Sequence, residues 1–153
     1  MVIARRPDGS FKLRLSAEER ELLAGLAEQL EEIVDAGPDD PVGRRLFPVA
    51  YPDDEEKEAE YRLLAGEELR SSQRAALEVM RSTAEAEVLS EDEVSAWLRS
   101  INAIRLVLGT RLDVQEDDAG VVDPEDPEVS ARMLYHYLSA LTDLIVQALS
   151  RTR

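Results

Sequence analysis

Apolar residues along the chain repeat with two different periods, and the change of period divides the sequence into two parts. In residues 11–15, FKLRL, apolar side chains alternate with cationic ones, a period of two that is typical of a strand with one buried face. Residues 1–6 precede this run and are joined to it by residues 7–10, PDGS, whose residue types favour a tight turn. The pattern predicts a β-hairpin over residues 1–15. Because so small a hairpin is marginal alone, we expect it to pack on a helix.

From residue 16 onward, apolar positions recur in steps of three and four, which is typical of amphipathic helices. Two capping boxes mark helix starts, Ser16 with Glu19 and Ser90 with Glu93. The sequence predicts five helices, over residues 16–36, 53–66, 67–88, 90–112 and 127–149, with Gly66 as the break between the second and third. The pattern is strongest in the fourth helix, which we expect at the centre of the fold.

Between the last two predicted helices, residues 113–126 form an acidic run interrupted by Gly120 and Pro124, and we expect a loop there. The length suits one domain over residues 1–153. The predicted fold class is all-α: a bundle of about five helices with a small N-terminal β-hairpin packed on it.

The composition disfavours catalysis. There are 33 acidic and 18 basic residues, a net charge of −15, no cysteine and a single histidine, His136. Disulfides, thiolate nucleophiles and zinc–thiolate sites are therefore absent, and a catalytic triad would depend on one imidazole. The acidic residues are typical of a solvated loop and of helix starts, so we expect no metal site, no cofactor and no enzyme activity.

No apolar run approaches the roughly 18–20 residues that a membrane span needs. The first residues, MVIARRP, lack the apolar core of a signal peptide. We therefore expect a cytoplasmic protein without membrane partners.

One cationic cluster stands out against the net negative charge. Arg5, Arg6, Lys12 and Arg14 lie in the predicted hairpin with Asp8 as the only acid. A β-ribbon can enter the major groove of DNA, so these four cations are candidate DNA contacts. The alternative is that they pair with acids on neighbouring helices.

The last predicted helix is apolar over a broad part of its circumference. Tyr135, Tyr137 and Leu141 lie on or beside this stripe, and tyrosine is favoured at interfaces because it buries area and keeps a polar tip. These three residues are candidates for a partner interface, including that of a homodimer. A helix buried within its own domain would show the same pattern.

Several runs resemble a known family: residues 46–54 (LFPVAYPDD), residues 60–63 (EYRL) and, most specifically, residues 97–112 (WLRSINAIRLVLGTRL). The family is that of the actinobacterial AosR-like oxidative-stress transcriptional regulators, formerly a domain of unknown function. With the hairpin and the last helix, the resemblance spans nearly the whole chain. It implies a cytoplasmic regulator that acts with DNA or transcription proteins. Because members are often encoded beside the ClpS protease adaptor, it also implies a link to protein turnover.

The resemblance defines no catalytic residues, and a chain without cysteine cannot sense oxidants through a disulfide. Met80 and Met133 can be oxidised, but both lie on predicted core stripes. Within residues 97–112, we expect Trp97 to anchor the core and Gly109 to mark a close backbone approach.

Two functional hypotheses follow. The first is a protein like the oxidative-stress transcriptional regulators, which acts through protein contacts and, through the hairpin, DNA contacts. The second is an interaction module that does not bind DNA, such as an adaptor linked to protein turnover or a homodimer.

Overall fold

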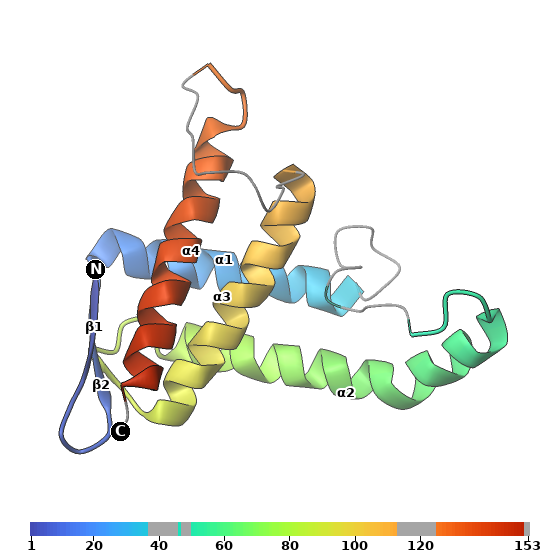
Figure 1. The fold of residues 1–153 in the computed structure, drawn as a ribbon, viewed down its shortest axis with the longest axis horizontal. Helices are drawn as coiled ribbons and strands as arrows, with labels where there is room; N and C mark the ends of the chain where they lie inside the picture. Colours follow the sequence, from blue (N-terminus) through green and yellow to red (C-terminus); the bar gives the residue numbers. More distant parts are fainter. Residues whose placement is uncertain (37–45, 47–49, 113–124, 152–153) are drawn as a thin grey trace.

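The computed structural model describes residues 1–36, 46, 50–112 and 125–151, and its fold is mostly helical (Figure 1). There are four helices in these residues: α1 (Ala17–Ala36), α2 (Glu55–Ser82), α3 (Glu91–Leu112) and α4 (Val129–Ser150). A small antiparallel sheet contains β1 (Val2–Arg5), β2 (Phe11–Arg14) and β3 (Val88–Leu89). The predicted acidic loop over residues 113–126 lies outside the described residues, apart from Glu125 and Asp126.

The described part of the chain contains four helices, so the prediction of about five is wrong. The helices predicted over residues 53–66 and 67–88 are one helix, α2, which runs through Gly66. A glycine inside a helix costs about 1 kcal/mol relative to alanine, which weakens a helix without ending it. The helix begins where Asp54 accepts a hydrogen bond from the backbone N–H of Lys57, at 3.0 Å.

The N-terminal hairpin is confirmed, and it belongs to a sheet of three strands with β2 in the middle. Ile3 lies opposite Leu13, and Phe11 lies opposite both Arg5 and Leu89. The third strand was not predicted, because residue 88 was assigned to a helix. That helix ends earlier, at Ser82, where the backbone N–H and the hydroxyl of Thr83 both donate to the carbonyl of Val79.

α3 is the central helix, as the sequence predicts, and it packs against the other three. Both capping boxes form, since Ser16 and Glu19 exchange two hydrogen bonds, as do Ser90 and Glu93. The largest fully buried side chains come from the sheet and all four helices: Trp97, Phe11, Leu23, Leu77, Met80, Leu89, Ile101, Leu138, Leu141, Ile145, Val34 and Val94. Trp97 anchors this core as expected, and its indole N–H donates to Thr83 Oγ1 at 2.7 Å.

Arg20 joins the sheet to the helices. Its guanidinium donates to the carbonyls of Ala84 at 3.0 Å, Ala86 at 2.7 Å and Leu13 at 3.0 Å. One partly buried cation on α1 therefore binds β2 and the turn that precedes β3. Because all three carbonyls lie outside helices, Arg20 satisfies acceptors that no helical N–H reaches.

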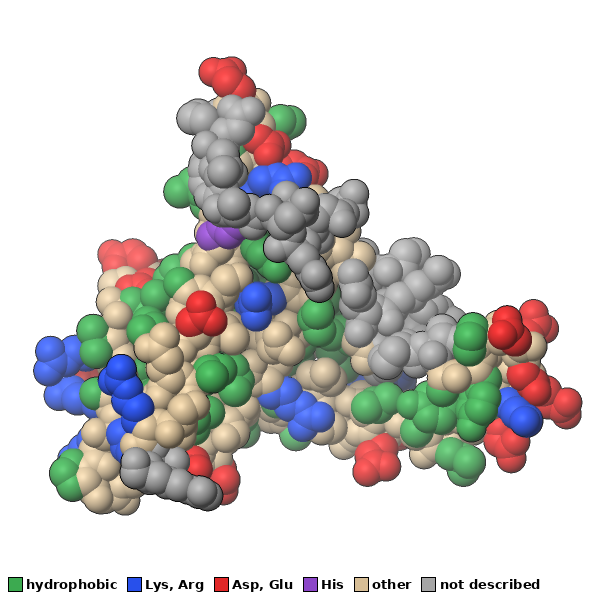
Figure 2. All heavy atoms as spheres, viewed as in Figure 1, with side chains coloured by type: hydrophobic (Ala, Val, Ile, Leu, Met, Phe, Trp, Pro, Cys, Tyr) green, Lys and Arg blue, Asp and Glu red, His purple; other side chains and the backbone are tan. Residues whose placement is uncertain are grey.

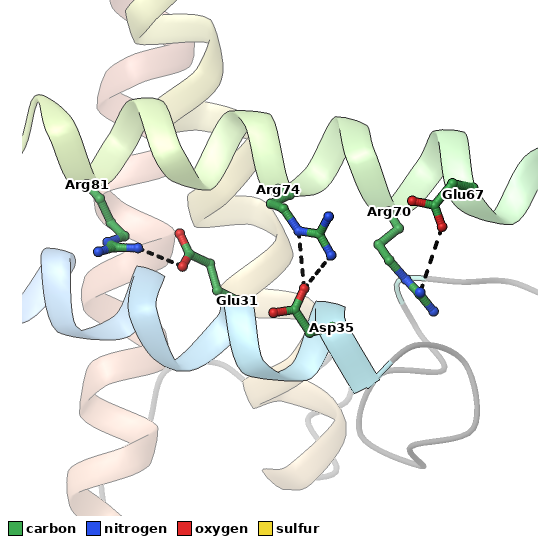
Figure 3. Close-up of polar contacts among 6 residues, drawn as sticks. All are labelled: Glu31, Asp35, Glu67, Arg70, Arg74 and Arg81. Atoms are coloured by element: carbon green, nitrogen blue, oxygen red, sulfur yellow. Dashed lines mark hydrogen bonds and ion pairs between the residues drawn. The ribbon is translucent and has the colours of Figure 1, made fainter.

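Ion pairs align α1 with α2 (Figure 3). Arg81 pairs with Glu31 at 2.7 Å, and the Nε of Arg74 donates to Asp35 at 3.1 Å. Asp35 is one residue from the end of α1, whereas α2 began well before Arg74. The N-terminal part of α2 therefore extends beyond the end of α1 (Figure 1). None of the described helices is both long enough and apolar enough to span a membrane.

Candidate interaction surfaces

Three of the four candidate DNA contacts lie in the strands, on two different faces of the sheet, and the fourth, Arg6, lies at the turn. Lys12 and Arg14 are exposed and alternate with the buried Phe11 and Leu13, so they occupy the outer face of β2. Arg5 lies on the inner face, opposite Phe11 in the register. The sheet therefore divides the predicted cluster.

Arg5 is half-buried, and its guanidinium lies 5.5 Å from the centre of the Phe11 ring, which is within the range of a cation–π contact. Its Nη1 is buried and has no hydrogen-bond partner. Arg6 is exposed at the turn, next to Asp8. Hydrogen bonds from Ser10 to the Asp8 carboxylate lower the pKa of Asp8, and Arg6 lowers it further. Three cations, Arg6, Lys12 and Arg14, are thus exposed to solvent.

The three candidate interface residues of α4 have different environments. Leu141 is fully buried and belongs to the core, so its surface is not available to a partner. Tyr137 packs against the core, and its hydroxyl donates to Glu19 Oε2 at 2.6 Å. This hydrogen bond lowers the pKa of Glu19, while burial and the Glu19 carboxylate raise the pKa of Tyr137. Tyr137 therefore links α4 to the start of α1.

Tyr135 of α4 contacts α3 within residues 97–112, the most specific part of the resemblance. A Cβ placed on Gly109 would lie 3.2 Å from Tyr135 Cε2, so the expected close approach at Gly109 is confirmed. The Arg105 guanidinium lies 5.7 Å from the Tyr135 ring centre, and its Nε donates to Ser139 Oγ at 3.1 Å. Arg105 Nη1 also lies 3.4 Å from Asn102 Oδ1. Arg105 and Gly109 thus pack α3 on α4.

Other expectations for α4 are settled in part. Met133 was assigned to the core stripe, but 56% of its surface is exposed, so it can be oxidised without opening the core. His136 is half-buried and lies edge-on to the Tyr135 ring, with 5.7 Å between ring centres.

Among the residues that the structure describes, no three His, Asp or Glu side chains converge as metal ligands would.

An apolar groove lies between α1, α3 and α4, a feature that the sequence did not predict. Its volume is about 70 Å³, it is partly open to solvent, and Leu134 of α4 lines one side. The other two helices contribute mainly aliphatic side chains: Leu26, Leu30 and Ile33 from α1, and Ile104, Leu108 and Arg111 from α3. Periodicity marked these leucines and isoleucines as core-facing. The distance between α1 and α4 where they border the groove depends on tertiary packing. The periodicity of apolar residues does not encode that distance.

A second surface that was not predicted is the projecting part of α2, residues 55–70, which we name the arm. None of its residues is buried, and Leu63 and Leu64 are 83% and 78% exposed. In the sequence these two leucines are adjacent and have no leucine three or four positions before them. This missing stripe was the available signal that Leu63 and Leu64 do not pack into the core of the described residues.

The described residues thus define a four-helix domain with a small N-terminal sheet, whose prominent surface features are a groove, an apolar arm and an exposed cationic strand. The chain belongs to the family described as a domain of unknown function, DUF2017, whose model matches residues 1–149. Neither the curated proteins nor the solved structures include a match to this chain.

Proposed function

We propose that this protein is a cytoplasmic transcriptional regulator of the oxidative-stress class that acts by binding other proteins. The proposal combines the resemblance with one observation: Ile104, Leu108 and Arg111, from the most specific part of the resemblance, line the groove between α1, α3 and α4. Other residues of that segment pack α3 on α4, whereas Leu108 is only partly buried and Arg111 is exposed, so this part of the segment leaves surface for a partner.

The groove is suited to a helical segment of a partner protein. Amphipathic helices dock with apolar side chains spaced three and four residues apart in grooves of this kind. Arg111 is exposed and is the only ionisable side chain among the described residues of the lining, so an acidic residue beside the partner's apolar stripe would complement it. The occupant is therefore expected to be an acidic amphipathic helix of a transcription protein.

Pulldown from extracts of the source cells, followed by mass spectrometry, tests the proposal. The bait proteins are the unmodified chain, Leu108→Glu in the groove, and Leu106→Glu, which changes an exposed leucine of the same helix outside the groove. We expect RNA polymerase or other transcription components with the unmodified and Leu106→Glu baits, and their loss with Leu108→Glu. Thermal melts must show that both variants fold.

Recovery of protease components in place of transcription components would favour the second hypothesis, an adaptor linked to protein turnover. If Leu108→Glu retains the same proteins as the control, the groove is not the binding site and the proposal fails.

The exposed cations of β2 support DNA contact as a second candidate function. Lys12 and Arg14 project from the same face of a strand, which is how β-ribbon proteins present side chains to DNA. Each phosphate contact contributes about 0.9 to the slope of log affinity against log salt. Replacing Lys12 and Arg14 with alanine should therefore reduce this slope by about 2 in an anisotropy titration.

Arg5→Ala is the matched control, because Arg5 lies on the inner face of the sheet. An unchanged affinity and slope in the Lys12 and Arg14 variant would exclude DNA contact by this strand.

A further inference from the structure

The arm presents apolar side chains within a frame of carboxylates. Glu56, Glu60, Leu63 and Glu67 are spaced by four, three and four residues, which places all of them on one face of the helix. Leu64 lies beside this face, four residues after Glu60. Glu67 pairs with Arg70 of the arm itself, whereas Glu56 and Glu60 make no ion pair with any described residue. This face therefore fits a partner surface that is apolar and cationic.

The outer face of the sheet has that composition. In the register, Lys12 lies opposite Val88 on one side, and Arg14 lies opposite Val2 on the other. Val2 and Val88 are 49% and 40% exposed, and Met1 nearby is 42% exposed. Side chains opposite each other in such pairs are about 5 Å apart, so the valines and the two cations form one continuous surface.

The two surfaces lie at opposite ends of the molecule. The sheet and the arm occupy the two ends of its longest axis (Figure 1). Basic side chains gather at the sheet end and acidic side chains at the arm end (Figure 2). They cannot meet within one copy of the chain, but the ends of two copies can.

We propose that this protein associates head to tail, with the arm of one copy docked on the outer face of the sheet of the next. A symmetric contact of arm with arm would place the Glu56 and Glu60 carboxylates of two copies together, which is unfavourable. A contact between different surfaces leaves one arm and one sheet free at the ends, so it propagates as an open chain. This inference is independent of the groove and of the proposed function.

The contact is small. The arm is about 24 Å long, and strands of four residues are about 13 Å long. Glu85 and Glu87 border the sheet near Lys12 and Arg14 and reduce its positive potential. We therefore expect weak association that depends on concentration and decreases with added salt.

Sedimentation analysis of the full chain at up to about 1 mM tests the proposal. The arm variant is Leu63→Ser with Leu64→Ser, and the sheet variant is Lys12→Glu with Arg14→Glu. All four side chains are exposed, so the fold should be retained, which thermal melts check. The weight-average mass of the unmodified chain should rise beyond that of a dimer, and each variant alone should associate at least tenfold more weakly.

The decisive sample is an equimolar mixture of the two variants. The arm variant retains an intact sheet and the sheet variant retains an intact arm, so the mixture should form one contact and stop at a heterodimer. A charge change on the arm, Glu56→Lys with Glu60→Lys, should weaken association of the otherwise unmodified chain. The matched control is Glu28→Lys with Glu32→Lys on the exposed side of α1, which has the same spacing. Its association constant should stay within twofold of that of the unmodified chain.

Three results would overturn the proposal. One is an unmodified chain that remains monomeric throughout the concentration range. Another is a mixture of the two variants that contains monomers alone. The third is a sheet variant that still dimerises while the arm variant does not, since that pattern requires contact of arm with arm.

Discussion

α3 and the arm of α2 are both regular helices, but α3 is stabilised by buried side chains and the arm by local polar interactions. Eight side chains of α3 are buried, including Trp97 and Ile101, whereas none in the arm is buried. The arm depends on local interactions, namely the Asp54 cap and the ion pairs of Glu58 with Arg62 and Glu67 with Arg70. Such pairs contribute only about 0.2–0.5 kcal/mol each.

The comparison separates apolar residues that build the domain from those that remain on its surface. In α3, most apolar side chains belong to the buried core or pack against it. The arm extends beyond the end of α1 (Figure 1), and its Leu63 and Leu64 are exposed to solvent. If this distinction is correct, mutations in the two regions should differ strongly in their effect on stability, and the following measurements test it.

The largest difference is expected between Trp97→Ala and Leu64→Ala. Removing a fully buried tryptophan should lower the free energy of unfolding by about 3–5 kcal/mol, because it leaves a cavity. Removing Leu64 should change it by less than about 0.5 kcal/mol. Urea unfolding followed by circular dichroism measures both, and a loss above 2 kcal/mol for Leu64→Ala would show that the arm is packed.

Arg20→Met should have the next largest effect. Methionine keeps most of the aliphatic stem but leaves the carbonyls of Leu13, Ala84 and Ala86 without their donor, at a cost of about 2 kcal/mol. The matched change in the arm, Arg62→Met, removes one exposed ion pair and should cost less than about 0.5 kcal/mol. Equal losses in urea unfolding would contradict the linking role of Arg20.

Tyr137→Phe should change how stability depends on pH. The hydrogen bond from Tyr137 lowers the pKa of Glu19 in the folded protein below its ordinary value of 4.5. The stabilisation is therefore complete above that value and is lost as the pH falls through the lowered one. A charged hydrogen bond contributes about 1.5 kcal/mol, so the unmodified chain should exceed the variant by this amount at pH 7.

That advantage should decrease below pH 4.5 in urea unfolding at several pH values. A difference that stays constant from pH 7 to pH 3 would show that the Glu19 carboxylate is not the partner.

The smallest effects are expected at two helical glycines. Nothing lies within 4 Å of a Cβ built on Gly66, so Gly66→Ala should raise the free energy of unfolding by about 0.5–1 kcal/mol. At Gly109 the added methyl would lie 3.2 Å from the Tyr135 ring, which is a crowded contact. Gly109→Ala should therefore not raise the free energy of unfolding as Gly66→Ala does. Thermal melts of both variants decide the matter, and equal stabilisation would show that Tyr135 does not constrain Gly109.

Sequence patterns predicted the parts of the fold that local chemistry determines. The capping boxes at Ser16 and Ser90, the hairpin turn and the buried stripe around Trp97 follow from neighbours within a few residues. The break predicted at Gly66 was a local error, whereas the missed strand β3 depends on a distant segment. β3 exists because Val88 and Leu89 meet β2, a strand close to the start of the described residues, and no local pattern encodes that pairing.

The candidate surfaces were less predictable than the fold. Alternation placed Lys12 and Arg14 on one face, but only the register of the sheet puts Arg5 on the other. Leu141 and Tyr135 shared one apparent stripe, and tertiary packing buried the first and set the second against Gly109. The groove and the arm depend on where α1 ends relative to its neighbours.

The position of β3 also determines the order in which the sheet is completed during synthesis. β1 and β2 leave the ribosome before α1 and α2, but a two-stranded hairpin is only marginally stable by itself. Its third strand emerges after two long helices have been made, and Arg20 finds the carbonyls of Ala84 and Ala86 at the same stage. The hairpin is therefore translated before the helices that it packs on, but it is fixed in place only after they have been made.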